Sequence, residues 1–169
     1  MRQTGLIACV GCGALVGDTD GPTHAYVGAS PGCWALFGEV LAVRYASDTE
    51  LAPESMFTDV YMVQHPGVPG RRSSQSVWVH LIALCLALEH GMAARPRMAA
   101  MQRILASGTT FDWLEPPATV GPMTILDIRD ADGPAARAEL IARWAETTWA
   151  AWAPHHSAVR ARAAALVGG

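Results

Sequence analysis

The run V-W-V-H-L-I-A-L-C-L-A-L, residues 77–88, decides the fold of this chain. It is the longest apolar stretch in the sequence, and it contains one histidine, His80. A helix that spans a bilayer needs about 20 apolar residues, so this run is too short to cross a membrane. We therefore expect a buried core helix from about Ser74 to His90, which Gly91 ends.

Apolar residues recur at spacings of three and four on either side of this core helix, which is the pattern of amphipathic helices. Ser30 and Pro31 open the clearest of them, since serine caps a helix and proline suits its first turn. The further helices are expected at 31–45, 53–64, 96–106, 134–152 and 158–167. Residues 123–128 form either a short strand or the lead into a helix. The sequence therefore predicts a mainly α, bundle-like domain of five or six helices.

Length and composition indicate one soluble globular domain over residues 1–169. The net charge is −3, all twelve basic residues are arginine, and they form no basic run. Such a chain lacks the positive surface that binds phosphate backbones, so we expect no nucleic-acid partner. Because no run is long enough to span a membrane, we also expect a cytoplasmic protein with no membrane partner.

Residues 5–33, the N-terminal lobe, differ in character from the helical body of residues 30–169. The lobe carries three of the four cysteines, is rich in glycine and shows no helical periodicity. A segment of this kind needs something other than an apolar core to hold it. Cys9-x2-Cys12 followed by Gly13 has the spacing of a zinc knuckle, in which a tight turn brings two thiolates to one ion.

A complete site needs two further ligands, and His24 and Cys33 are the candidates in the lobe. Cys33 lies in the first turn of an expected helix, where the helix dipole favours the thiolate that zinc binds. With Cys9 and Cys12 these residues make a Cys3His set, which is typical of structural zinc. The sequence therefore predicts a metal-binding lobe with Cys9, Cys12, His24 and Cys33 as ligands and Zn²⁺ as the cofactor.

Other interpretations of the Cys9 and Cys12 pair are a redox dithiol, a disulfide, a lipid anchor and two free thiols. A redox motif begins a helix after a strand, and no βαβ pattern follows here. A disulfide is unusual in a cytosolic chain. We expect no lipid anchor, because the short lead before Cys9 is interrupted by Gln3 and Thr4. Free thiols remain the alternative to a metal site.

A second group of polar side chains lies on the second and third predicted helices. Tyr61 and His65 share one helical face at an i, i+4 spacing, and Gln64 adjoins them. We predict that Asp59, Tyr61, Gln64, His65 and His80 form an acid–base or metal site. The alternative for each histidine is a hydrogen-bonded residue of the core, and Asp59 would then be a solvated charge.

His65 is also an alternative to His24 as the fourth zinc ligand. That choice would join the lobe to the helices in one site, and an open coordination position there would make the metal catalytic. The spacing leaves open whether His65 and His80 meet. Arg71 and Arg72, in the loop between the two helices, either bind an anion or form a solvated charge pair.

The segment W-A-E-T-T-W-A-A-W-A-P-H-H, residues 144–156, joins three tryptophans to two histidines. We expect the tryptophans to belong to the core, because they recur on the face of a long amphipathic helix. His155 and His156 follow a proline kink, and we expect them to be exposed or to line a site.

Several motifs resemble those of an uncharacterised, mainly actinobacterial family that is named only as a domain of unknown function. They are C-x2-C-G, D-G-P-T-H-x-Y (20–26), S-P-G-C-W (30–34), D-x-Y-x-V-Q-H-P-G (59–67), Q-S-V-x-V-H-L (75–81) and W-A-x-W-A-P-H-H (149–156). The resemblance covers nearly the whole chain. It implies that the family motifs include Cys9, Cys12, His24, Cys33, His65 and His80. It implies no activity.

Two functions are compatible with this sequence. The first is a small zinc-dependent enzyme of hydrolase, lyase or cyclase type that acts on a small molecule, in specialised metabolism. Metal-bound water would be activated there, with His65 or His80 as the base and Tyr61 as a donor. The second is a non-catalytic, zinc-stabilised module that binds a small ligand or a protein, because four protein ligands leave no open position on the ion.

Overall fold

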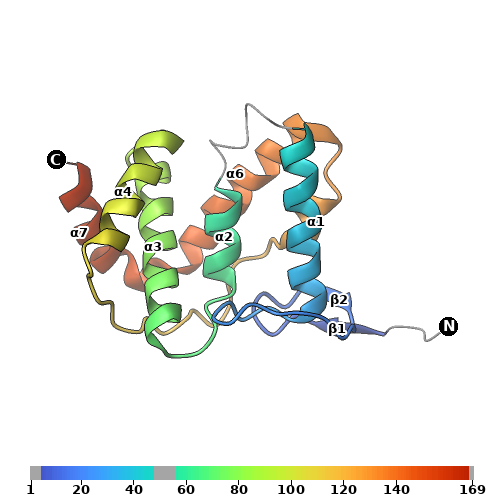
Figure 1. The fold of residues 1–169 in the computed structure, drawn as a ribbon. Helices are drawn as coiled ribbons and strands as arrows, with labels where there is room; N and C mark the ends of the chain where they lie inside the picture. The colour runs from blue at the N-terminus through green and yellow to red at the C-terminus, as the bar shows by residue number, and fades with distance from the viewer. Residues whose placement is uncertain (1–4, 48–55, 168–169) are drawn as a thin grey trace.

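The apolar run at 77–88 lies in α3 (Arg71–Leu88), the helix around which the body is arranged. The structure is a computed structural model, and it describes residues 5–47 and 56–167. α2 (Phe57–Gln64) lies on one side of α3 and α4 (Ala94–Ala106) on the other (Figure 1). Within the described ranges, no helix combines the length and the apolarity that a bilayer-spanning segment requires.

The remaining helices are α1 (Pro31–Ser47), α5 (Ile125–Arg129), α6 (Gly133–Ala151) and α7 (His156–Val167), with a 3-10 turn at Ala153–His155. All of them except the short α5 agree with the periodicity of the sequence. α6 passes behind α2 and α3, while α1 stands at the far side of the molecule from α7 (Figure 1). The predicted mainly α fold is therefore confirmed. Residues 53–55 of the expected second helix lie outside the described residues.

Local hydrogen bonds explain the start of α5, which the sequence left open, and the start of α3, which the sequence predicted wrongly at about Ser74 with Arg71 and Arg72 in a loop. Thr124 and Asp127 form a capping box, in which each side chain accepts a backbone N–H at the start of α5. The segment at 123–128 is therefore the lead into a helix and not a strand. α3 begins at Arg71 and not at Ser74, because the Ser74 N–H already donates to the Gly70 carbonyl oxygen, at 2.9 Å.

The N-terminal lobe contains a feature that the sequence did not predict, a two-stranded antiparallel hairpin. β1 (Leu6–Ala8) pairs with β2 (Leu15–Gly17), with Ile7 opposite Val16. Strands of three residues are too short to show a clear alternation of apolar and polar side chains. The hairpin lies below the N-terminal end of α1, so the knuckle of the lobe faces the helical body (Figure 1).

Stacked aromatic rings connect the lobe side of the body to its centre. The Phe37 ring of α1 lies 4.2 Å from the Tyr61 ring and 5.3 Å from the Phe57 ring of α2. Phe57 in turn meets Trp144 of α6 edge to face at 6.0 Å. Trp144 and Trp152 are fully buried, as expected for the tryptophans of 144–156. These contacts fix α2 between α1 and α6.

Candidate metal centre

Four side chains from separate elements converge below α1 and α2. Cys9 follows β1, Cys12 lies in the hairpin turn, Cys33 is in the first turn of α1, and His65 is the residue that ends α2. Their candidate ligand atoms all lie within 4.8 Å of one another. Cys9, Cys33 and His65 are buried and Cys12 is half-buried. The arrangement is a Cys3His cluster that could hold a metal ion.

The distances in the cluster fit a tetrahedral zinc site. A zinc ion with bonds of about 2.3 Å to sulfur and 2.0 Å to nitrogen separates two sulfurs by about 3.8 Å and a sulfur from a nitrogen by about 3.5 Å. The Cys12 and Cys33 sulfurs are 3.9 Å apart. Cys33 Sγ lies 3.4 Å from His65 Nε2. These two separations match the tetrahedral values, and all four ligand atoms lie within 4.8 Å of one another.

The tautomer of His65 is set by its own helix. Its Nδ1 lies 2.7 Å from the carbonyl oxygen of Tyr61, one helical turn earlier. A carbonyl only accepts hydrogen bonds, so Nδ1 carries the proton and the Nε2 lone pair points to the cluster. The Tyr61 ring stacks on the His65 ring with centroids 4.0 Å apart. This hydrogen bond and this stacking hold the imidazole in the orientation that a metal ligand needs.

Two donors stabilise negative charge on the sulfurs. The Tyr61 hydroxyl donates to Cys33 Sγ at 3.4 Å, and burial, followed by the neighbouring thiolates, raises the pKa of Tyr61 well above its usual range. The backbone N–H of Ser30 donates to Cys9 Sγ at 3.5 Å. Ser30 Oγ in turn accepts the Val10 N–H at 3.0 Å and so fixes the hairpin turn on the start of α1. Tyr61 is therefore a donor to a ligand.

The three thiols cannot all ionise together without a cation. Hydrogen bonds from Cys12 and Cys33 hold the pKa of Cys9 far below its usual range, whereas contacts with Cys12 and Cys9 raise the pKa of Cys33. Burial alone would lower the pKa of His65, but its hydrogen bonds to Cys12 and Cys9 raise it to about 9. A divalent ion would remove this conflict, because it stabilises all three thiolates and takes the place of the imidazole proton.

Close backbone contacts bring the knuckle to His65. A Cβ atom on Gly11 would lie 2.5 Å from both the Gly28 carbonyl oxygen and His65 Cδ2, so only glycine fits in this turn. Gly28 packs equally closely on Gly67, where a Cβ would lie 2.8 Å from the Gly67 Cα. The Gly28 N–H also donates to the His65 carbonyl oxygen at 3.0 Å. These contacts explain the glycines at positions 11, 28 and 67.

His24, the fourth ligand that the lobe suggested, lies outside the cluster. Its Nδ1 accepts the Tyr26 N–H at 3.5 Å, and its ring packs edge to face on the Tyr26 ring at 4.3 Å. The other face of His24 meets Trp34 at 5.2 Å. The structure thus brings His65 to the three thiols and leaves His24 in an aromatic group on the outer loop, because the glycine contacts carry the end of α2 to the knuckle.

The remaining residues of the predicted helical site separate into two groups. Gln64 is fully buried and its amide nitrogen donates to Val120, Met123 and Thr148, which ties α2 to the 120–123 loop and to α6. Asp59 and His80 pair with each other in a different place, with 2.8 Å between Oδ1 and Nδ1. His65 and His80 therefore belong to separate clusters.

The histidines after Pro154 and the fourth cysteine have contacts of their own. His155 Nε2 lies 2.8 Å from the Glu115 carbonyl oxygen, and the His156 ring stacks on Trp149 at 3.8 Å. Cys85 is buried in α3, and burial raises its pKa to about 11. No disulfide joins any of the four cysteines.

Sequence reasoning missed the backbone groups that complete the centre. The sequence predicts that Ser30 caps α1. In the structure its backbone N–H donates to Cys9 Sγ, and its hydroxyl oxygen accepts the Val10 N–H. The joint presence of glycine in S-P-G-C and Q-H-P-G was the available signal, since glycine permits two backbones to approach closely.

Comparison with known proteins places this chain in a family. Residues 7–153 match the model of DUF5946, a family of unknown function, and the chain therefore belongs to that family. The four clustered residues all lie within the matched range. No curated protein and no solved structure matches the chain.

Proposed function

We propose that this member of DUF5946 is a zinc-stabilised module, in which Cys9, Cys12, Cys33 and His65 bind one structural zinc ion. The observation that carries the proposal is the convergence of four ligand atoms within 4.8 Å in a mostly buried site. Three thiolates and one imidazole favour zinc among the common divalent ions, and four protein ligands complete its tetrahedral shell.

The zinc would stabilise the junction between lobe and body. Two of its ligands belong to the hairpin and the other two to α1 and α2, so one ion would link three elements that are distant in sequence. A lobe with short strands and few buried side chains gains most from such a link, because metal binding then supplies folding free energy. The module would bind a small ligand or a protein on its surface. The zinc ion would catalyse no reaction.

The test is metal analysis of protein purified without added zinc. We expect about one zinc per chain in the wild type. Cys12→Ser removes the most exposed ligand and should lose the zinc, whereas Cys85→Ala alters a cysteine outside the cluster and should keep it. Equal zinc content in the two variants, or a wild type without zinc, would contradict the proposal.

A zinc-dependent enzyme acting on a small molecule is the second candidate. It is favoured by a cavity of about 700 Å³ whose lining includes Cys9 and Cys12 together with the loop at 116–121. A substrate in this cavity would approach the ion from the side of the half-buried Cys12. Catalysis would require one ligand to yield its position to water or substrate.

Cobalt substitution separates the two candidates. Co²⁺ in place of zinc reports its coordination through its visible spectrum, and azide binds only where a position is open. A spectrum unchanged by azide supports the structural role. A new azide-dependent band, which Cys12→Ser abolishes or alters, would support the enzyme.

A further inference from the structure

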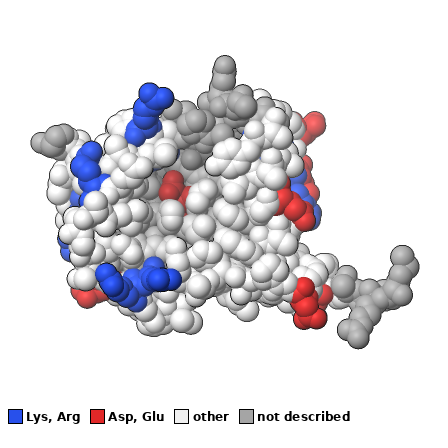
Figure 2. Space-filling view, viewed as in Figure 1, with Lys and Arg blue, Asp and Glu red and all other residues white. Residues whose placement is uncertain are grey.

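A second group of polar side chains lines a cavity of about 430 Å³ formed by α2, α3, α4 and one residue of the lobe. The polar residues of its lining are Tyr26, Asp59, Arg72, Gln75, Ser76 and His80. Figure 2 shows a hollow on this face of the molecule, with an acidic group inside it. The volume lies within the range of small-molecule pockets, about 300–1,000 Å³.

The Asp59–His80 pair leaves a free base in this cavity. Asp59 Oδ1 lies 2.8 Å from His80 Nδ1, and an ionised carboxylate only accepts hydrogen bonds. Nδ1 therefore donates to the carboxylate, and in the neutral ring the lone pair lies on Nε2. Among the residues that the structure describes, none is hydrogen-bonded to His80 Nε2. The His80 side chain is 23% exposed, so a ligand in the cavity can reach it.

Arg72 adds a cation to the same cavity. It is exposed at the start of α3, and in the described part of the chain no carboxylate forms an ion pair with it. Figure 2 shows basic side chains at the lower edge of this face of the molecule. The one acidic residue of the lining, Asp59, is already engaged by His80. Arg72 is therefore the cation that the lining offers to an anionic ligand.

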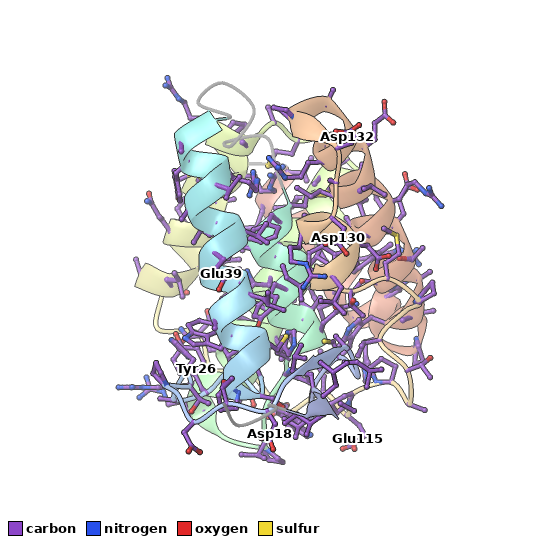
Figure 3. The ribbon with its side chains drawn as sticks, turned by 90° about the vertical axis from the view of Figure 1, so that its right-hand side faces the viewer. Asp18, Tyr26, Glu39, Glu115, Asp130 and Asp132 are labelled. Atoms are coloured by element: carbon purple, nitrogen blue, oxygen red, sulfur yellow. The ribbon has the colours of Figure 1, made fainter. Side chains whose placement is uncertain are left out.

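The rest of the lining is suited to an apolar group. Val79, Met101 and Leu105 form the apolar wall of the cavity, on α3 and α4. Tyr26 reaches it from the lobe, and Figure 3 shows this residue beside the lower end of α1. A guanidinium next to an apolar wall matches a carboxylate on a short hydrocarbon.

We propose that this cavity binds a small organic carboxylate, with its head on Arg72 and its apolar part against Val79, Met101 and Leu105, and that His80 Nε2 accepts a hydrogen bond from an O–H or N–H group of the bound molecule. Asp59 holds the imidazole in the orientation that this hydrogen bond needs. His80 is the hydrogen-bond acceptor in this site and Asp59 is a positioning residue.

This inference goes beyond the zinc site and depends on the lobe only through Tyr26. Arg72, Asp59 and His80 are not metal ligands, so their variants should retain zinc. If hexanoate does not bind but the protein contains zinc, the zinc proposal is unaffected. If hexanoate binds but the protein contains no zinc, the carboxylate proposal is unaffected.

The test compares three probes that share one hydrocarbon chain: hexanoate, hexanol and hexylammonium. Each is titrated into the zinc-loaded full chain, and amide chemical shifts of Tyr26, Ser76 and His80 are followed. We expect hexanoate to bind most tightly. Arg72→Gln should weaken hexanoate about tenfold, the effect of one charge-assisted contact. Arg71→Gln is the matched control, because Arg71 is the exposed neighbour that does not line the cavity, and it should leave binding unchanged.

A second measurement tests the free base. In protein with ¹⁵N-labelled histidine, His80 should be the Nδ1–H tautomer, and Asp59→Asn should shift it toward the Nε2–H form. Four outcomes would each overturn the proposal. In the titrations these are amide chemical shifts that do not change with hexanoate at tens of millimolar, tighter binding of hexylammonium than of hexanoate, or equal losses of hexanoate affinity in the two arginine variants. In the labelled protein it is an Nε2–H tautomer of His80 in the wild type.

Discussion

The N-terminal lobe and the helical body are stabilised in different ways. In the lobe, Leu6, Val10 and Leu15 are 68%, 81% and 58% exposed, so these apolar side chains add little core. In the body, Leu81 and Leu84 of α3 are fully buried, as are many residues around them. The body therefore depends on burial of apolar surface, and under the zinc proposal the lobe depends on coordination by its side chains. One chain can therefore hold two adjoining regions together with different interactions, ligand side chains in the lobe and apolar contacts in the body.

The largest effect is expected from removal of the zinc. A structural zinc site supplies about 10–16 kcal/mol in small metal-dependent folds. A strong chelator should therefore abolish hydrogen-exchange protection of β1 and β2, while α3 keeps its protection because its contacts lie in the apolar core. Exchange measured by mass spectrometry checks this. Simultaneous loss of protection in α3 would show that the two regions are not separately stabilised.

The next effect tests the body. Trp144 is fully buried against Phe57, and Trp144→Ala should destabilise the protein by about 3–5 kcal/mol. Urea unfolding measures the loss, and Trp144→Phe should cost less because it leaves a smaller cavity. Both variants should retain about one zinc per folded chain. A Trp144→Phe variant that folds but has lost zinc would show that the core also supports the metal site.

A pair of glycine variants sharpens the comparison at the junction. Gly11→Ala puts a Cβ atom 2.5 Å from His65 Cδ2, so it should push the knuckle from α2 and weaken zinc affinity by about 10–100-fold. Gly38→Ala is the control: this position in α1 has open space, and alanine there should stabilise the helix by about 0.5–1 kcal/mol. Competition with a chromophoric chelator measures the affinities. Unchanged zinc affinity in Gly11→Ala would contradict the close approach.

The smallest effect concerns a surface pair of the body. Glu89 accepts from Arg160 at 2.8 Å and from Trp149 at 3.0 Å, and the hydrogen bond from Arg160 lowers its pKa to about 2. Because the carboxyl pKa is lower in the folded state, the ionised Glu89 stabilises the fold at pH values above its unfolded pKa of about 4.5. This contribution is lost as the pH falls toward 2. Glu89→Gln should therefore be slightly less stable than wild type at pH 7, with the gap closing in acid. Thermal melts at several pH values measure it; a constant gap would contradict this assignment.

Much of the helical body could be predicted, because burial imposes a period of 3.6 residues on the sequence. The core helix at 77–88 and the long helix before Pro154 show that period clearly. The short helix α5 could not be assigned from periodicity, since its start depends on the Thr124 capping box. The hairpin escaped prediction because three-residue strands carry too few positions to show alternation.

The candidate site was predictable in its cysteines and not in its histidine. Cys9, Cys12 and Cys33 follow from spacing, since a knuckle and a helix start place thiolates where an ion can bind. Sequence proximity favoured His24 over His65. The outcome depends on close contacts between segments far apart in the chain, in which Gly11 approaches the His65 ring and Gly28 approaches the Gly67 backbone. Such contacts leave no periodic pattern in the sequence.

X-ray absorption at the zinc edge of wild type, His65→Ala and His24→Ala tests most directly whether His65 joins the lobe to the body. We expect three sulfurs at about 2.3 Å and one nitrogen at about 2.0 Å in the wild type and in His24→Ala, with the imidazole signal lost in His65→Ala. An imidazole signal that survives in His65→Ala and disappears in His24→Ala would contradict the account.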